Sequence, residues 1–203
     1  MADSGGVTVL RTGAANLASV VAALERAQQT IRWADSAQDV VDAGHVVLPG
    51  VGAFGPAMAR LRADGFVQAL RTRIEQGQPT LAVCLGLQLL GAGSDESPNV
   101  EGLGVFSQRA VAFGGGLRVP QLGWNRVEPA GDWLTSDYAY FANSYFLAEA
   151  PVGWAAAYST YGSQRLVAAI GRRGVLACQF HPELSGPWGQ ALVERWLAGG
   201  WPC

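Results

Sequence analysis

The most constraining feature of this sequence is a short apolar stretch that changes its periodicity at a cysteine. Residues 80–83 form an apolar, partly β-branched run that is typical of a buried parallel strand. Gly86 interrupts the run, and leucines at 87, 89 and 90 resume at a spacing that suits a short helix. The pattern therefore predicts that Cys84 lies at the corner where a strand becomes a helix.

A side chain on such a corner is lifted out of the sheet and points toward solvent or a ligand. Backbone amides at the start of the following helix favour a thiolate and a developing oxyanion. The arrangement is mechanically the same as the serine nucleophile elbow of hydrolases. The alternative is that Cys84 is a small apolar core residue, as most free cysteines are.

The length and composition suit one compact domain over residues 1–203, with a sizeable core. A net charge of −2 with no basic stretch argues against nucleic acid as a partner. We see no secretory signal and no apolar run of membrane-spanning length. Three cysteines without a close pair favour a reducing cytoplasm. With two histidines and no cluster of metal-ligand spacing, we expect no metal.

The first half of the chain predicts alternating strands and helices. Short joins between them indicate right-handed βαβ units and a parallel sheet, so the predicted fold class is α/β with flanking helices. The expected elements are strands at 7–10, 31–33, 45–48 and 80–83, a helix capped by Asn16, a helix capped by Ser36 and ended by Gly44, and a helical pattern from Pro56 to Glu75 that Gly65 interrupts.

The second half predicts a mainly antiparallel section added to the α/β half. Residues 93–98 read as a polar loop, and residues 114–116 as a hairpin or bulge signal. The expected elements are strands at 105–106, 111–113, 117–120, 138–146, 154–158, 166–170 and 175–180, and a final amphipathic helix at 192–197.

A thiol nucleophile needs a base, and the base needs a third group to orient it. His181 follows a buried strand, at the sheet edge where α/β folds place their sites. Glu183 lies two residues later, across Pro182, and can reach back to the imidazole; alternatively it is a solvated loop carboxylate. His45 starts a strand at the opposite end of the sheet, so we expect no catalytic role for it.

Glycines follow the strand at 45–48. Gly50 and Gly52 permit close backbone approach to a ligand and unusual peptide orientations. The segment lacks the ending of a phosphate loop, and a plain tight turn is the alternative.

Together these motifs resemble those of the class I (triad) glutamine amidotransferases, whose signature is a glycine-rich oxyanion loop, a cysteine elbow and a His-Pro-Glu turn. Segments at 13–20, 48–55, 119–125 and 140–145 look like those of the glutaminase subunits of imidazole glycerol phosphate synthase. The Gly-Trp-Asn at 123–125 and the Tyr-Phe-Ala-Asn-Ser-Tyr at 140–145 are the discriminating segments. The resemblance implies a three-layer, flavodoxin-like fold with a central, mostly parallel sheet.

The resemblance also implies the role of each site residue. Cys84 would be the nucleophile, His181 the general base and acid, and Glu183 the group that orients His181. The positions implied to hold glutamine or its oxyanion are Gly50, Gly52, Leu85, Gln88, Asn143, Ser144 and Tyr145. No cofactor is implied. The implied partner is a (β/α)8-barrel cyclase subunit, which receives the ammonia and produces imidazole glycerol phosphate and an aminoimidazole carboxamide ribotide in histidine biosynthesis.

Some positions depart from the family pattern. Arg11 and Thr12 replace Asp-Tyr, while Ala15 and Ala82 each replace a glycine. Leu184 replaces a lysine that normally contributes to the cyclase contact. These departures leave the polar detail of the docking surface open, and the roles of Cys178 and Cys203 are open as well.

Three other functions remain in competition. They are another triad amidotransferase, serving purine or pyridoxal phosphate synthesis, a non-catalytic amidotransferase-like binding module, and a cysteine peptidase on a related fold. Within the favoured function, we expect the Gly50–Gly52 loop to rest with a carbonyl, not an amide, facing the oxyanion position.

Overall fold

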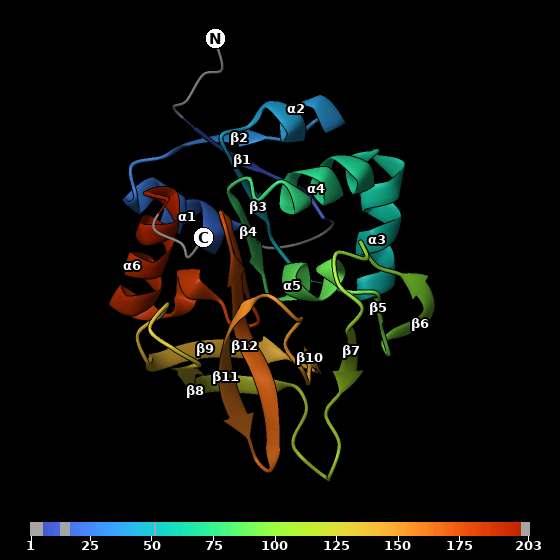
Figure 1. Cartoon of the computed structure of the whole chain (residues 1–203), viewed down its shortest axis with the longest axis vertical. Helices are drawn as coiled ribbons and strands as arrows, with labels where there is room; N and C mark the ends of the chain where they lie inside the picture. The colour runs from blue at the N-terminus through green and yellow to red at the C-terminus, as the bar shows by residue number, and fades with distance from the viewer. Residues whose placement is uncertain (1–5, 13–16, 51, 200–203) are drawn as a thin grey trace.

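The computed structural model describes residues 6–12, 17–50 and 52–199. Its main sheet has nine strands in the order β2-β1-β3-β4-β13-β12-β11-β8-β9 (Figure 1). The pairs from β2 to β13 are parallel, and those from β13 to β9 are antiparallel. The strands of this sheet are β1 (Gly6–Val9), β2 (Thr30–Trp33), β3 (His45–Leu48), β4 (Thr80–Val83), β8 (Gln121–Pro129), β9 (Asp137–Asn143), β11 (Ala155–Tyr161), β12 (Gln164–Arg172) and β13 (Val175–Cys178).

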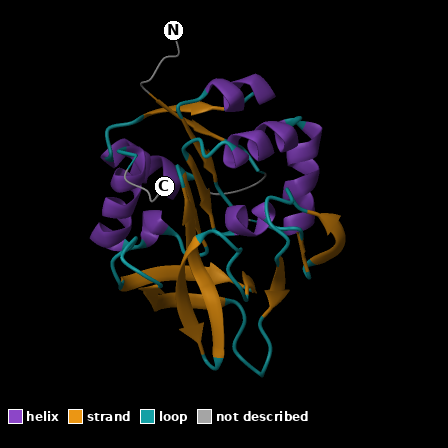
Figure 2. Ribbon diagram, in the orientation of Figure 1, coloured by secondary structure: helices purple, strands orange, loops and turns teal. Residues whose placement is uncertain are grey.

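Helices cover both faces of the parallel part, which gives the expected three layers (Figures 1 and 2). The helices are α1 (Ala18–Arg26), α2 (Ala37–Asp42), α3 (Phe54–Ala63), α4 (Phe66–Glu75), α5 (Leu85–Leu90), a 3-10 turn η1 (Pro182–Leu184) and α6 (Gly186–Leu197). A smaller sheet, in the order β10-β7-β5-β6, contains β5 (Gly93–Ser94), β6 (Ser97–Glu101), β7 (Arg109–Ala112) and β10 (Tyr145–Leu147).

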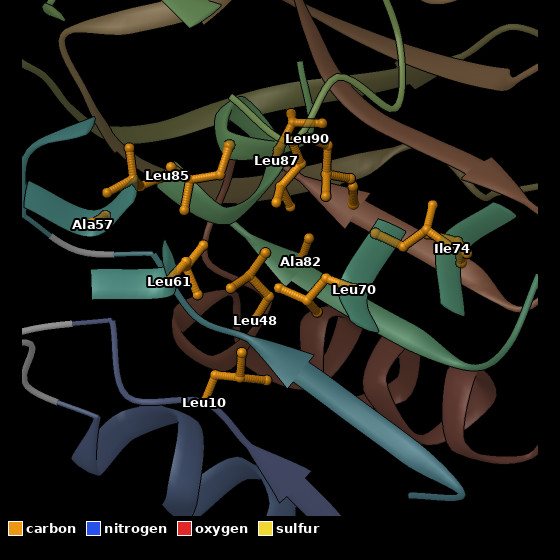
Figure 3. Close-up of a cluster of buried hydrophobic side chains, with 14 of the residues drawn as sticks. Leu10, Leu48, Ala57, Leu61, Leu70, Ile74, Ala82, Leu85, Leu87 and Leu90 are labelled. Carbon is orange, nitrogen blue, oxygen red and sulfur yellow. The ribbon is translucent and has the colours of Figure 1, made fainter. Parts of the chain in front are cut away.

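Each face of the main sheet has its own hydrophobic core. One core joins the sheet to α3, α4 and α5, and Leu48, Leu70 and Leu87 lie within it (Figure 3). The other joins the sheet to α1 and α6 through side chains such as Leu24 and Trp196. Burial on both faces explains why the strands of the parallel part read as continuous apolar runs.

Most of the predicted elements of the first half are confirmed. Ser36 caps α2 in a capping box with Asp39, whose backbone N–H donates to the serine hydroxyl. Gly65 separates α3 from α4 with a left-handed φ of 74°. The predicted cap Asn16 lies outside the described residues.

Several predictions for the second half are wrong. Residues 105–106 and 117–120 form no strand, residues 93–98 belong to the β5–β6 hairpin rather than a loop, and 138–146 splits into β9 and β10. The glycines at 114–116 make a turn between two sheets, not a hairpin. The last helix starts at Gly186, before the apolar spacing that suggested residue 192.

Strand β8 was missed for a physical reason. Its outward residues Leu122 and Trp124 are apolar, with 63% and 54% of their surface exposed, while Gln121 on the opposite face is buried. This is the reverse of the usual alternation in a half-buried strand. The inversion gives the molecule an exposed apolar surface on β8.

Candidate active site

Cys84 occupies the predicted corner between β4 and α5. Its backbone has φ 52° and ψ −109°, a conformation that a residue with a side chain rarely adopts. The backbone N–H of Cys84 donates to the carbonyl oxygen of Cys178 over 2.6 Å, which ties the corner to β13. Gly86 permits the sharp turn, because a Cβ there would meet the carbonyl oxygen of Leu48. The strand-to-helix elbow is confirmed.

His181 and Glu183 form a buried pair beside this corner. The imidazole Nδ1 lies 2.8 Å from Oε1 of Glu183, and both side chains are more than nine-tenths buried. The backbone of His181 is fixed by its N–H, which donates to the carbonyl oxygen of Tyr140. Ser185 adds a second tie, since its hydroxyl donates to the carbonyl oxygen of His181 and accepts the N–H of Tyr140. Glu183 therefore orients the imidazole, and it is not a solvated loop carboxylate.

The surroundings of His181 favour its charged form. Burial alone lowers the pKa of the imidazole, but hydrogen bonds and charges from Cys84 and Glu183 outweigh burial and raise that pKa to about 10. An imidazolium between a sulfur and a carboxylate stabilises a thiolate on Cys84. The three side chains are thus ordered as thiol, imidazole and carboxylate, which is the order that a nucleophile, its base and an orienting acid would require.

A cavity of about 230 Å³ opens at the sulfur of Cys84. Every position expected to hold glutamine lies on its wall, together with Cys84 and His181. Glu183 lies behind His181 and lines a neighbouring cavity of about 180 Å³. The expected positions on the wall are Gly50, Gly52, Leu85, Gln88, Asn143, Ser144 and Tyr145.

Sequence reasoning missed three residues of this cavity wall: Glu96, Pro120 and Ala142. Among the described residues of the wall, Glu96 brings the one carboxylate, and its Oε2 accepts the backbone N–H of Phe54 at the start of α3 over 2.7 Å. A carboxylate there suits the α-ammonium group of an amino acid. In the sequence Glu96 is one acid among several in a polar stretch, and no local signal distinguishes it.

The glycine loop approaches the corner closely, as predicted. A Cβ on Gly50 would meet backbone atoms of Val83, Leu85 and Gly86. The carbonyl oxygen of Gly50 accepts the backbone N–H of Leu85 over 3.4 Å. Gly52 has φ 101°, in the region that favours glycine. Val51, between them, lies outside the described residues.

His45 starts β3, away from the cavity, as expected. Its ring packs edge-on against Trp196, with ring centroids 5.1 Å apart. Burial is the main cause of a lowered pKa for this imidazole. Cys178 is fully buried, and burial first, with the charge of Glu183 second, raises the pKa of its thiol. Such a thiol is inert. Cys203 lies outside the described residues.

The departures at the end of β1 have structural roles. The guanidinium of Arg11 bonds Asp35 over 3.0 Å and lies over the ring of Trp33. Thr12 donates its hydroxyl proton to the carbonyl oxygen of Pro49. Ala82 is fully buried in β4, and Leu184 is 42% exposed. Ala15 lies outside the described residues.

The described part of the chain contains no group of three or more His, Cys, Asp and Glu side chains that could hold a metal ion. In that same part, no helix is long and apolar enough to cross a membrane.

Comparison with known proteins identifies the class. The family model for glutamine amidotransferase class-I matches residues 11–198. A solved structure described as a glutamine amidotransferase superposes with a TM-score of 0.76 at 22% identity, covering 96% of this chain and all of that one. The chain belongs to the class-I glutamine amidotransferase family.

Curated relatives define a narrower group. The HisH subunit of imidazole glycerol phosphate synthase from Synechococcus sp. (strain JA-2-3B'a(2-13)) is 38% identical over 200 residues, covering 94% of this chain and 91% of that relative. The HisH subunit from Thermosynechococcus vestitus is 41% identical over 192 residues, covering 90% and 91%. In Emericella nidulans, imidazole glycerol phosphate synthase hisHF is 34% identical over 202 residues, which cover 92% of this chain and 36% of that protein. Within its family, the chain groups with the HisH subunits.

Proposed function

We propose that this chain is the glutaminase subunit of an imidazole glycerol phosphate synthase. It hydrolyses L-glutamine to L-glutamate and passes the ammonia to a (β/α)8-barrel cyclase subunit, which makes imidazole glycerol phosphate and an aminoimidazole carboxamide ribotide in histidine biosynthesis. The observation that supports this most directly is the meeting of Cys84 and His181 at one cavity, with Glu183 2.8 Å behind the imidazole. The similarity to HisH subunits is the reason for assigning the ammonia to imidazole glycerol phosphate synthesis.

The first half of the reaction forms a thioester. The thiolate of Cys84 attacks the side-chain carboxamide carbon of glutamine, and the carbonyl oxygen becomes an oxyanion. A backbone N–H at Leu85, and a second from the glycine loop, would stabilise this oxyanion by about 3 kcal/mol each. The C–N bond then breaks as the imidazolium of His181 donates its proton to the leaving nitrogen, which departs as ammonia.

The second half releases glutamate. Neutral His181 takes a proton from a water molecule as that water attacks the thioester carbon. The C–S bond breaks, glutamate leaves, and the thiolate and imidazolium are restored. Glu183 keeps the imidazole in one orientation throughout, and no metal or cofactor takes part in the proposed steps.

The other wall residues would hold the amino-acid end of glutamine. Glu96 would accept hydrogen bonds from the α-ammonium group, because it places a carboxylate on the wall. Gln88 and the backbone at residues 143–145 would contact the remaining polar atoms. A cavity of about 230 Å³ is small, which suits an amino acid better than a peptide segment.

The cyclase subunit would dock on the exposed apolar surface of β8 and β9. Leu122, Trp124 and Tyr138 are each more than half exposed, and Tyr138 pairs with Arg126 on the same hairpin. Ala142 of β9 also lines the cavity, so this surface adjoins the place where ammonia forms. Leu184 is a further exposed apolar side chain, in the turn that His181 joins to β9 through its bridge with Tyr140. Large exposed apolar side chains on one hairpin are typical of a protein interface.

The decisive experiment combines purification and assay. The chain is co-expressed with candidate barrel subunits, and the purified complex is given glutamine and the cyclase substrate. We expect equal amounts of glutamate and imidazole glycerol phosphate. Ammonia production with a different acceptor would indicate another triad amidotransferase, and peptide cleavage without glutaminase activity would indicate a peptidase. Absence of both reactions would indicate a binding module. We place the protein in the cytoplasm, consistent with the free Cys84 and Cys178.

A further inference from the structure

The side-chain carboxamide of Gln179 lies against the sulfur of Cys84, outside the substrate cavity. Gln179 follows β13, and its side chain is completely buried. Its Nε2 lies 3.6 Å from Sγ of Cys84, within hydrogen-bond distance for sulfur. Gln179 is absent from the cavity wall, so it cannot act by holding glutamine.

The orientation of the Gln179 carboxamide is fixed by its neighbours. Gln88 donates from Nε2 to the carbonyl oxygen of Tyr145 over 2.8 Å, and that oxygen can only accept. The same nitrogen donates to Oε1 of Gln179 over 3.1 Å. With its oxygen committed to Gln88, Gln179 must present its NH2 group to the sulfur.

The other contacts of the sulfur make this donor important. The carbonyl oxygen of Ala142 lies 3.8 Å from Sγ and can accept a hydrogen bond from the thiol, but it cannot donate one to a thiolate. His181 is the titrating donor to Cys84. An amide N–H is a donor that never titrates, and a hydrogen bond to the charged form of a group favours that form.

We propose that Gln179 is a positioning residue that holds the sulfur of Cys84 and stabilises its thiolate, with Gln88 fixing its orientation. This inference rests on the proposed role of Cys84 as nucleophile. It assigns Gln88 a second task besides the cavity wall, because the carboxamide that faces substrate also orients the donor to the sulfur. Binding of glutamine beside Gln88 is thereby connected to the state of the nucleophile.

The test is the pH profile of Cys84 alkylation by iodoacetamide in the full chain, followed by mass spectrometry of the peptide that carries Cys84. Gln179→Met keeps an unbranched side chain of similar size and removes the N–H. We expect the midpoint of its profile to rise by about one pH unit, with the plateau rate at high pH unchanged. In the complex with the cyclase, kcat should fall about tenfold at neutral pH while KM stays within about threefold.

Two controls separate positioning from loss of structure. Gln121→Leu removes another buried carboxamide, one that has no hydrogen-bond partner among the described residues, and should leave the midpoint in place. Alkylation of the buried Cys178 reports a loosened core. If Cys178 is alkylated in Gln179→Met, the pH profile is measured on Gln179→Leu instead. If Cys178 is alkylated in that variant too and the midpoint for Cys84 does not shift, the result counts against the proposal.

A midpoint in Gln179→Met equal to that of the parent or of Gln121→Leu would overturn the inference. The outcome is independent of the proposed function, because alkylation reads the sulfur directly. If Cys84→Ala keeps glutaminase activity while Gln179→Met still shifts the profile, the proposed role of Cys84 as nucleophile fails and the contact between Gln179 and the sulfur stands.

Discussion

The backbone N–H of Leu85 donates to the carbonyl oxygen of Gly50, 3.4 Å away. Leu85 follows the proposed nucleophile, so this N–H is the donor that an oxyanion on the substrate would need. In the described structure that N–H is already hydrogen-bonded to the carbonyl oxygen of Gly50, in the glycine loop. The relationship agrees with the expectation that the loop rests with an oxygen, not an N–H, toward the oxyanion position.

We therefore predict that the chain alone hydrolyses glutamine slowly and that its partner activates it. Docking of the cyclase and binding of the cyclase substrate would favour a loop state that frees the Leu85 N–H. A shift from about 1:99 to mostly competent needs several kcal/mol of differential binding. Glutamate release is measured for the lone chain, the complex, and the complex with cyclase ligand. Equal turnover in all three would exclude this gating.

Cys84→Ala should abolish glutamine hydrolysis, because no other group on the cavity wall can form the thioester. The cyclase reaction of the complex should continue when ammonium salts replace glutamine. Both the glutamine-dependent and the ammonium-dependent reaction are monitored by measuring the imidazole glycerol phosphate formed. Loss of the ammonium-dependent reaction as well would mean that Cys84 has a structural role.

The pKa values of the two histidines should differ from the ordinary imidazole value in opposite directions. The pKa of His181 is raised to about 10 and that of His45 is lowered below 6.5, so imidazole NMR signals of the parent should show two separate transitions. His45→Ala leaves His181 as the sole histidine, so its signal is assigned without ambiguity. This variant should keep glutaminase activity within a few-fold of the parent, and a loss as large as that of His181→Ala would refute the placement of His45 outside the site.

The raised pKa of His181 also predicts in which direction the stability of the fold changes with pH. A group with a pKa higher in the folded than in the unfolded state stabilises the fold fully below its unfolded pKa, near 6.5. That contribution is lost as pH rises through about 10. The melting temperature of the parent should thus fall more steeply between these pH values than that of His181→Gln.

The sequence revealed features whose physical cause is local. The apolar run before Cys84 and the glycine after it are enough to place the elbow, and Ser36 with Asp39 is enough to start α2. Glu96 and Gln179 could not be placed in the same way, because their contacts with Phe54 and Cys84 span 42 and 95 residues. Those contacts exist only after the sheet has assembled.

Arg73 is another residue whose long-range contacts could not be predicted from the sequence, and its contacts bear on stability. It is almost fully buried in α4 and donates to the carbonyl oxygens of Val40, Ala43, Gly44 and Pro79 and to the hydroxyl of Thr80. These bonds tie α4 to the turn before β3 and to the start of β4. Nothing in the helical pattern of residues 66–75 separates Arg73 from Arg71, the other arginine there.

Arg73→Met should therefore lower the free energy of unfolding by about 3–5 kcal/mol, because several buried acceptors lose their donor. Arg71→Met, at a half-buried position on the same helix, is the matched control and should cost less than about 1 kcal/mol. Urea unfolding of the two variants gives the comparison. Equal losses would show that the hydrogen bonds of Arg73 contribute little.

The exposed surface of β8 should contribute more to association than to folding. Trp124 is 54% exposed and packs edge-on against Tyr140, with ring centroids 6.1 Å apart. Removing it exposes no core, so Trp124→Ser should leave the melting temperature of the lone chain within a few degrees. A tryptophan at the centre of an interface commonly contributes 2 kcal/mol or more, so the Kd for the cyclase subunit should rise at least about thirtyfold. Val152→Ser, at a position 96% exposed in the loop after β10, should leave Kd within about twofold. An unchanged Kd for Trp124→Ser would move the docking surface off β8 and leave the inverted pattern of that strand without an explanation.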